Sequence, residues 1–263
     1  VVINVTVSAT SNNWIGVVDS SWSNPGNWSL GTVPNGGCLE IDIMIPAGAP
    51  NMPVVDANIA VNNITVMAGA QLMIAASDTL ASCGNITHSG IQNMGAGTLW
   101  INGSSAQLLS GQLVVETFVM DNPAGLNIQA GSSLALRYAL IMVQGDIDVP
   151  ASSSLTLRSR PSKTAYLDDF TFPSAGSITD GAGDGNITME RWVINPVNAF
   201  HFISSAVVDG DVNDWANDFT ITGPNFAQVI PLPNCDPNNL APNSPYGQLF
   251  EHREWRVTNC SFE

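Results

Sequence analysis

Basic residues are scarce in this chain. Lys and Arg together number 7 against 22 Asp and Glu, which gives the 263 residues a formal net charge of −15. Nucleic-acid binding needs a basic surface that neutralises phosphates, so this class of partner is excluded. An anionic membrane surface is disfavoured for the same reason. The simplest explanation of the negative net charge is that it keeps an extracellular protein soluble.

Long hydrophobic runs are also missing. No apolar run approaches the roughly 20 residues that a membrane-spanning helix needs, so we expect no transmembrane segment. No signal peptide is recognisable, and we expect Val1 to be a mature N-terminus or the start of a fragment.

Recognised catalytic motifs are absent as well. The chain has no H-E-x-x-H, no G-x-S-x-G, no P-loop and no dinucleotide-binding glycine pattern. His88, His201 and His252 are isolated in the sequence, and a packed structural role explains them better than a general base. We therefore expect no organic cofactor and, on balance, no enzyme.

Cysteine is rare, and none of the four cysteines forms a C-x-x-C pair, which argues against a zinc or redox site. An even number in a Lys-poor chain fits an oxidising compartment. Three pairings are open, and we favour the one that keeps both loops local: Cys38–Cys83 and Cys235–Cys260. Four buried free thiols are the alternative.

What the chain does contain is a repeat, over residues 61–157. A turn rich in Gly, Ala and Ser is followed by Leu, any residue and an apolar residue. Three of these leucines recur at one interval, since 134 − 113 and 155 − 134 both give 21: Leu113, Leu134 and Leu155. Leu72 and Leu99 are 27 apart, which suggests an insertion in that turn.

A fixed period with short strands is typical of a stacked solenoid, in which each coil buries its apolar face against the next. We therefore predict an all-β fold, a parallel β-helix, with a β-sandwich as the alternative. The expected organisation is an N-terminal strand and cap over 1–40, solenoid coils over 41–184, and a β-rich part with a Pro/Asn-rich loop over 185–263.

The N-terminal part holds two candidate features. Three tryptophans lie within fifteen positions, and we expect them to form a lid over the open end of the solenoid rather than a sugar-stacking platform: Trp14, Trp22 and Trp28. An alternating stretch opens the chain and predicts a strand whose edge pairs internally or with a neighbouring molecule: Val1, Val2, Ile3, Val5 and Val7.

Calcium is the small ligand that the sequence suggests. An acidic loop places oxygen ligands at alternate positions, as calcium loops do: Asp209, Asp211, Asn213 and Asp214. The loop lacks the sixth-position Gly and the twelfth-position Glu of an EF-hand, so the alternative is a solvated acidic turn.

The motif order resembles that of large secreted surface proteins of Bacteroidetes-type bacteria. The residues that carry the resemblance are W-S-N-P-G-N-W-S at 22–29, G-T-V-P-N at 31–35, I-P-A-G at 45–48, P-V-V at 53–55, E-R-W at 190–192 and F-H-F-I-S-S-A-V at 200–207. In the last motif Phe200 and Ala206 replace the Trp and Pro usual in those proteins.

The resemblance implies export by the type IX secretion system and a role in adhesion, gliding or surface coating. It also implies a short O-glycosylation pattern at Asp78-Thr79-Leu80, with Thr79 as the acceptor. These motifs are architectural, so they indicate fold and origin better than activity.

Two classes of function follow. The first is a non-enzymatic, secreted or cell-surface module that is structural or adhesive, including a self-assembling filament subunit. Its partners would be copies of itself, other surface proteins or glycans. The second is a polysaccharide-active β-helix, lyase or hydrolase, or a binding-only version of it. Asp146 and Asp148, two residues apart on one strand face, are then the candidate carboxylates, and a solvated turn is the simpler explanation.

Overall fold

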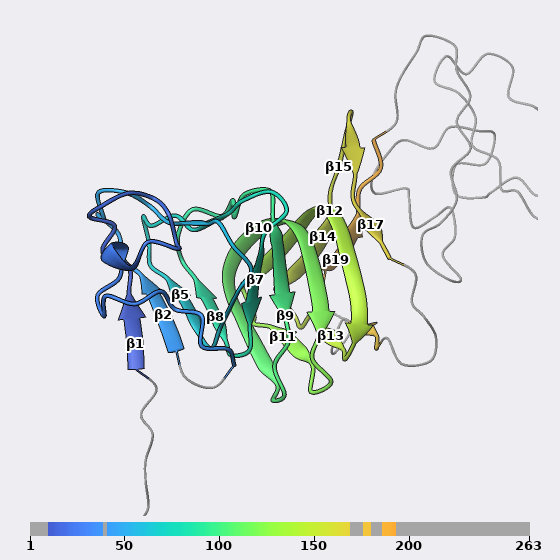
Figure 1. Cartoon of the computed structure of the whole chain (residues 1–263). Helices are drawn as coiled ribbons and strands as arrows, with labels where there is room; N and C mark the ends of the chain where they lie inside the picture. Colours follow the sequence, from blue (N-terminus) through green and yellow to red (C-terminus); the bar gives the residue numbers. More distant parts are fainter. Residues whose placement is uncertain (1–9, 39–40, 169–175, 180–185, 193–263) are drawn as a thin grey trace, which may run out of the picture. The chain divides into compact units, whose positions relative to one another are not determined.

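A computed structural model describes residues 10–38, 41–168, 176–179 and 186–192. All described residues belong to one unit of the chain, residues 1–192. Within it the strands pair in parallel from one coil to the next, which makes the fold a β-solenoid (Figure 1).

Three strand positions recur in the coils and build three faces of the stack. The first face contains, in order, β1 (Thr10–Asn13), β2 (Ile41–Ile45), β5 (Ile64–Val66), β8 (Ile86–His88), the start of β10 (Gln107–Asp121), β11 (Leu126–Ile128), β13 (Ile147–Asp148) and β18 (Ile178–Thr179). Figure 1 shows β1, β2, β5 and β8 side by side along this face.

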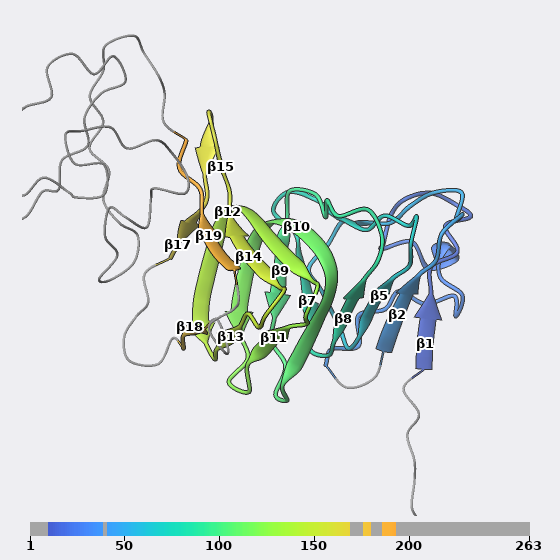
Figure 2. The same cartoon turned by 180° about the vertical axis from the view of Figure 1, so that it is seen from behind.

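Along the chain, the coils continue from the first face into the second and then into the third face (Figure 2). The second face contains β3 (Val54–Val55), β6 (Met73–Ile74), the middle of β10, the first half of β12 (Ser133–Gln144), β14 (Ser154–Leu157) and β19 (Asn186–Met189). The third face contains β4 (Ile59–Val61), β7 (Thr79–Ser82), β9 (Thr98–Ile101), the ends of β10 and β12, and β17 (Tyr166–Leu167).

Two short elements stand outside the parallel stack. A 3-10 turn, η1 (Pro25–Asn27), is capped by Asn24, whose side chain accepts a hydrogen bond from the Gly26 N–H. An antiparallel hairpin consists of β15 (Ser159–Arg160) and β16 (Lys163–Thr164). Because the pairing in the described stack is otherwise almost entirely parallel, the β-sandwich alternative, which needs antiparallel sheets, is wrong.

The predicted leucine column is confirmed. Leu113 pairs in register with Leu134, and Leu134 with Leu155, and all three are fully buried. The proposed insertion between Leu72 and Leu99 is wrong, because the residue paired with Leu99 is Leu80. Leu72 lies before β6 in the same coil as Leu80, so the true step is 99 − 80, or 19 residues.

The stack continues on both sides of the 41–184 range expected for the coils. Thr10–Asn13 pairs with Ile41–Met44, and Asn186–Met189 pairs with Ser154–Leu157. One apolar core runs through these coils, from Trp14 at one end to Leu157 and Ala165 near the other. A single apolar core therefore connects the described coils.

One corner depends on a glycine. Gly111 sits where β10 turns from the first face to the second, with φ +103°, a conformation that other residues rarely adopt. A Cβ there would lie 1.8 Å from the backbone oxygen of His88 in the preceding coil. The absent side chain lets consecutive coils approach closely at this corner.

A column of one Asp and two Asn side chains, here called the amide column, joins the coils of β2, β5, β8 and β10 outside the core. The Asn63 N–H donates to Asp42 Oδ1 at 3.2 Å, the Asn85 N–H to Asn63 Oδ1 at 2.7 Å, and the Leu108 N–H to Asn85 Oδ1 at 2.9 Å. Each coil therefore supplies an acceptor for a backbone donor of the next.

Candidate functional site

The three N-terminal tryptophans form one buried cluster. Trp14, Trp22 and Trp28 are at most 1% exposed. Trp28 meets Trp14 edge to face with ring centroids 5.0 Å apart, and meets Trp22 in the same way at 4.5 Å. Their indole N–H groups donate to the backbone oxygens of Asn51, Pro34 and Trp22. Buried rings offer no face to a sugar, so the three tryptophans pack as part of the apolar core. Their role as a lid stays a prediction.

Polar side chains form a hydrogen-bonded network around the segment that carries Trp22 and Trp28. Asp19 accepts hydrogen bonds from the side chains of Asn24 and Asn27 at 2.9 and 2.7 Å, and these bonds lower the pKa of Asp19. Asp56 accepts from the hydroxyls of Ser21 and Ser23. Partial burial works against ionisation of Asp56, but the serine hydrogen bonds outweigh it, so its pKa is lowered as well.

The predicted disulfide between Cys38 and Cys83 is present. It joins the segment before β2 to the residue that follows β7. Cys235 and Cys260 lie outside the described residues, so their pairing stays a prediction.

Asp146 and Asp148 are tied to the next coil. Asp146 Oδ1 accepts from the Ser177 N–H at 2.7 Å and from the Ser177 hydroxyl at 2.8 Å. Asp148 accepts from the Asn127 amide at 2.6 Å and from the Thr179 hydroxyl at 3.3 Å. Both carboxylates therefore take part in hydrogen bonds between coils.

Several predicted residues lie outside the described part of the chain. These are the assembly residues Val1, Val2, Ile3, Val5 and Val7, the calcium loop with Asp209, Asp211, Asn213 and Asp214, and His201 and His252. Within the described ranges no three His, Cys, Asp or Glu side chains gather into a group that could hold a metal ion. None of the described helices is long and apolar enough to cross a membrane.

Thr79 and His88 are both described. Thr79 begins β7, is half-buried, and pairs with Thr98 of the next coil. His88 is 1% exposed, and neither ring nitrogen has a hydrogen-bond partner. Burial lowers the pKa of His88, because burial disfavours the charged form of the ring.

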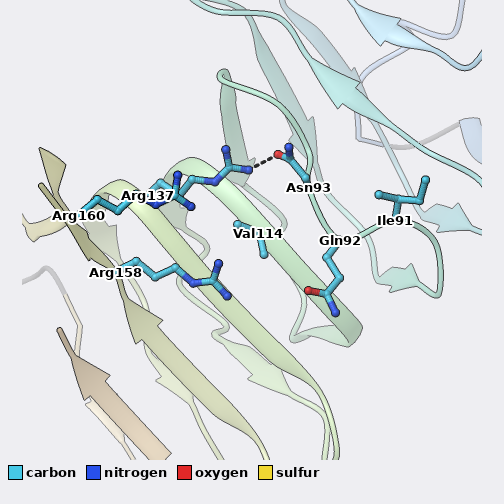
Figure 3. A pocket seen from close by; sticks show the side chains of 7 residues that line it. All are labelled: Ile91, Gln92, Asn93, Val114, Arg137, Arg158 and Arg160. Carbon is cyan, nitrogen blue, oxygen red and sulfur yellow. Dashed lines mark hydrogen bonds between the residues drawn. The ribbon is translucent and has the colours of Figure 1, made fainter. Parts of the chain in front are cut away.

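An open pocket of about 460 Å³ lies on the second face. We call it the arginine pocket and define it by its lining residues: Ile91, Gln92, Asn93, Val114, Arg137, Arg158 and Arg160. Figure 3 shows the arginine side chains on one side and the 91–93 segment on the other, with Val114 between them.

Adjacent coils bring these arginines together. Arg137 follows Leu136 of β12, Arg158 follows Leu157 of β14, and Leu136 pairs with Leu157. Arg160 is the second residue of β15, the strand that begins directly after Arg158. The signal was present in the sequence, because 158 − 137 equals 21, the same step as the leucine column. Sequence analysis followed that step for leucine only and missed the arginines.

The opposite wall carries amides and an apolar side chain. Asn93 Oδ1 accepts a hydrogen bond from Arg137 Nη2, and the Gln92 amide donates to Gln112. Ile91 is 49% exposed, whereas Val114 is 7% exposed. The pocket thus combines cationic, amide and apolar groups, and its lining residues in the described part of the chain include neither a carboxylate nor a histidine.

The nearby acidic side chains have other partners. Glu116 forms an ion pair with Lys163, and Glu190 accepts a hydrogen bond from the Ser159 N–H at 2.9 Å. Burial is the main cause that lowers the pKa of Arg137. Attraction by Glu116 opposes this shift, and weaker repulsion from Arg160 and Arg158 adds to it. Arginine stays charged at any physiological pH, so the pocket is a local positive site.

An exposed aromatic pair adjoins the arginines. Tyr138 follows Arg137 in β12, and Tyr166 lies in β17 of the next coil. The two rings meet edge to face with centroids 5.3 Å apart, and each residue is 41% exposed. Lys163, paired with Arg160 in the hairpin, lies over the Tyr138 ring at 4.0 Å from its centroid.

Comparison of the chain with protein-family models, with curated proteins and with solved structures gives no match. The resemblance to Bacteroidetes-type surface proteins therefore stays a prediction.

Proposed function

We propose that this protein is a non-enzymatic, extracellular module of a bacterial surface protein with a structural and adhesive role. It is secreted and displayed at the cell surface, where it contacts glycans, other surface proteins or further copies of itself. A filament subunit is one form of the same proposal.

The observation that supports it best is the continuous core of stacked coils. Every coil from β2 to β14 contributes buried Leu, Ile or Val side chains to one cluster, and backbone pairing joins each coil to the next. Such a stack resists deformation because no coil unfolds without exposing its neighbours. Its outer side chains are free for contacts that carry load.

The surroundings of the carboxylates favour binding over catalysis. Glycoside hydrolysis needs one carboxyl group that donates a proton and a second that acts as base or nucleophile. Asp146 and Asp148 instead accept hydrogen bonds from the neighbouring coils, and the arginine pocket is lined by cations and amides. This arrangement supports recognition of a ligand without turnover.

The test combines adhesion with turnover. Beads that carry the full chain are held under flow against films of acidic or neutral polysaccharide, and released reducing ends and unsaturated products are measured in the same effluent. We expect retention without product. The Asp146→Ala/Asp148→Ala variant should retain beads equally well.

Release of product by the native chain, lost in that variant, would instead establish the polysaccharide-active alternative. Light scattering over a concentration series separates the two forms of the proposal. Growth into long assemblies would establish a filament subunit, whereas a constant mass would leave a single adhesive module.

A further inference from the structure

Positive charge is concentrated on one part of an acidic protein. The chain has seven Lys and Arg, and five of them lie between residues 137 and 191. Three of those five line the arginine pocket. In a chain with a net charge of −15, such a concentration calls for an explanation in terms of what binds there.

Among the described residues no carboxylate forms a direct ion pair with an arginine of this cluster. Arg158 and Arg160 form no side-chain ion pair or hydrogen bond among the described residues. Arg137 donates to Asn93, but its Nε is buried and has no hydrogen-bond partner. Guanidinium groups that repel one another gain most from an anion placed between them, because each then forms a charge-assisted hydrogen bond.

The remaining walls favour a sugar as the carrier of that anion. Gln92 and Asn93 present amides suited to hydroxyl groups, and Ile91 offers an apolar patch to the face of a pyranose ring. Tyr138, which forms the exposed aromatic pair with Tyr166, follows Arg137 directly in β12. A long polyanion is disfavoured, since the rest of the molecule is acidic.

We propose that the arginine pocket binds an acidic sugar, a glycan unit that carries a carboxylate or a sulfate ester held by Arg137, Arg158 and Arg160. This inference names the ligand class of the adhesive function proposed above and rests on that function for its biological meaning. The binding itself is tested separately.

The experiment is titration calorimetry of the full chain with four probes. Trigalacturonate carries carboxylates, a sulfated galactose disaccharide carries sulfate esters, galactotriose is neutral, and sodium sulfate is the anion without a sugar. We expect binding of at least one acidic sugar at least tenfold tighter than galactotriose and sodium sulfate. The two acidic probes distinguish the carboxylate from the sulfate ester.

Matched variants locate the site. Arg158→Gln removes one positive charge from the pocket, and Arg191→Gln removes one outside it, where Arg191 Nη1 donates to the backbone oxygens of Ala165 and Glu190. We expect Arg158→Gln to weaken binding at least tenfold, the Arg158→Gln/Arg160→Gln variant still more, and Arg191→Gln less than threefold. Circular dichroism checks that each variant is folded.

Three results would overturn the inference: no binding of either acidic probe, equal binding of galactotriose or sodium sulfate, or equal weakening by Arg158→Gln and Arg191→Gln. Failure of the adhesive function looks different. Beads retained by a chain that binds no acidic probe would refute the pocket alone. Binding at the pocket followed by release of product would support the pocket and refute the non-enzymatic function.

Discussion

Replacing Leu134 by Ala should open a cavity in the middle of the solenoid core. Leu134 is fully buried and lies in register between Leu113 and Leu155 of the adjacent coils. The strands above and below are held by ladders of backbone hydrogen bonds, so the coils cannot close over the missing atoms. We therefore expect a loss of about 3–4 kcal/mol in the free energy of unfolding, in the middle of the range for Leu→Ala.

The matched control is Leu108→Ala. Leu108 is 45% exposed in the same unit, and its contribution to the amide column comes from its backbone N–H, which the substitution keeps. We expect a change within about 0.5 kcal/mol there, as for other surface substitutions. Guanidinium denaturation followed by circular dichroism measures both variants. A loss below about 1 kcal/mol for Leu134→Ala, or equal losses in both variants, would refute the packing argument.

Three further predictions concern a corner, a buried histidine and the disulfide. Gly111→Ala should destabilise by about 2 kcal/mol or more, because its Cβ would meet the His88 backbone oxygen at a positive φ; a variant as stable as the native chain in denaturation would refute this. Because the pKa of His88 is lowered in the folded chain, the unfolded chain binds a proton at this histidine more readily than the folded chain does. The free energy of unfolding should therefore fall as the pH drops below 6.5. His88→Met should flatten that part of the profile of unfolding free energy against pH, and an unchanged slope would contradict it. Replacing Cys38 and Cys83 by Ala removes a link across 45 residues and should cost about 2–4 kcal/mol, measured by denaturation with and without reductant; equal midpoints for variant and native chain would argue against it.

The core could be predicted from the sequence because burial and period act together. In each coil the inward positions have to be apolar, so Leu113, Leu134 and Leu155 repeat at the step of the coil itself. The Cys38–Cys83 pairing was predictable because, among the partners open to Cys38, Cys83 closes the shortest loop, and a shorter loop loses less entropy on closure.

The parts that sequence analysis missed depend on contacts between coils. The 91–93 segment has no strand pattern, yet Asn93 forms a bridge with Val114 and so brings an amide wall to the arginines. The step from Leu72 to Leu99 compared two different strand positions, because the same turn and apolar pattern serves more than one face. A repeat in the sequence predicts that the chain forms stacked coils. Which face of the stack a given strand joins depends on the positions of the turns within each coil.

The most direct test of binding without turnover is mass spectrometry of trigalacturonate and of the sulfated galactose disaccharide after long incubation with an equal amount of the full chain. We predict that at least one of the two sugars is retained by the protein and that both are recovered intact. A shortened or unsaturated sugar would identify an enzyme, and retention of neither sugar would contradict recognition of an acidic glycan by the arginine pocket.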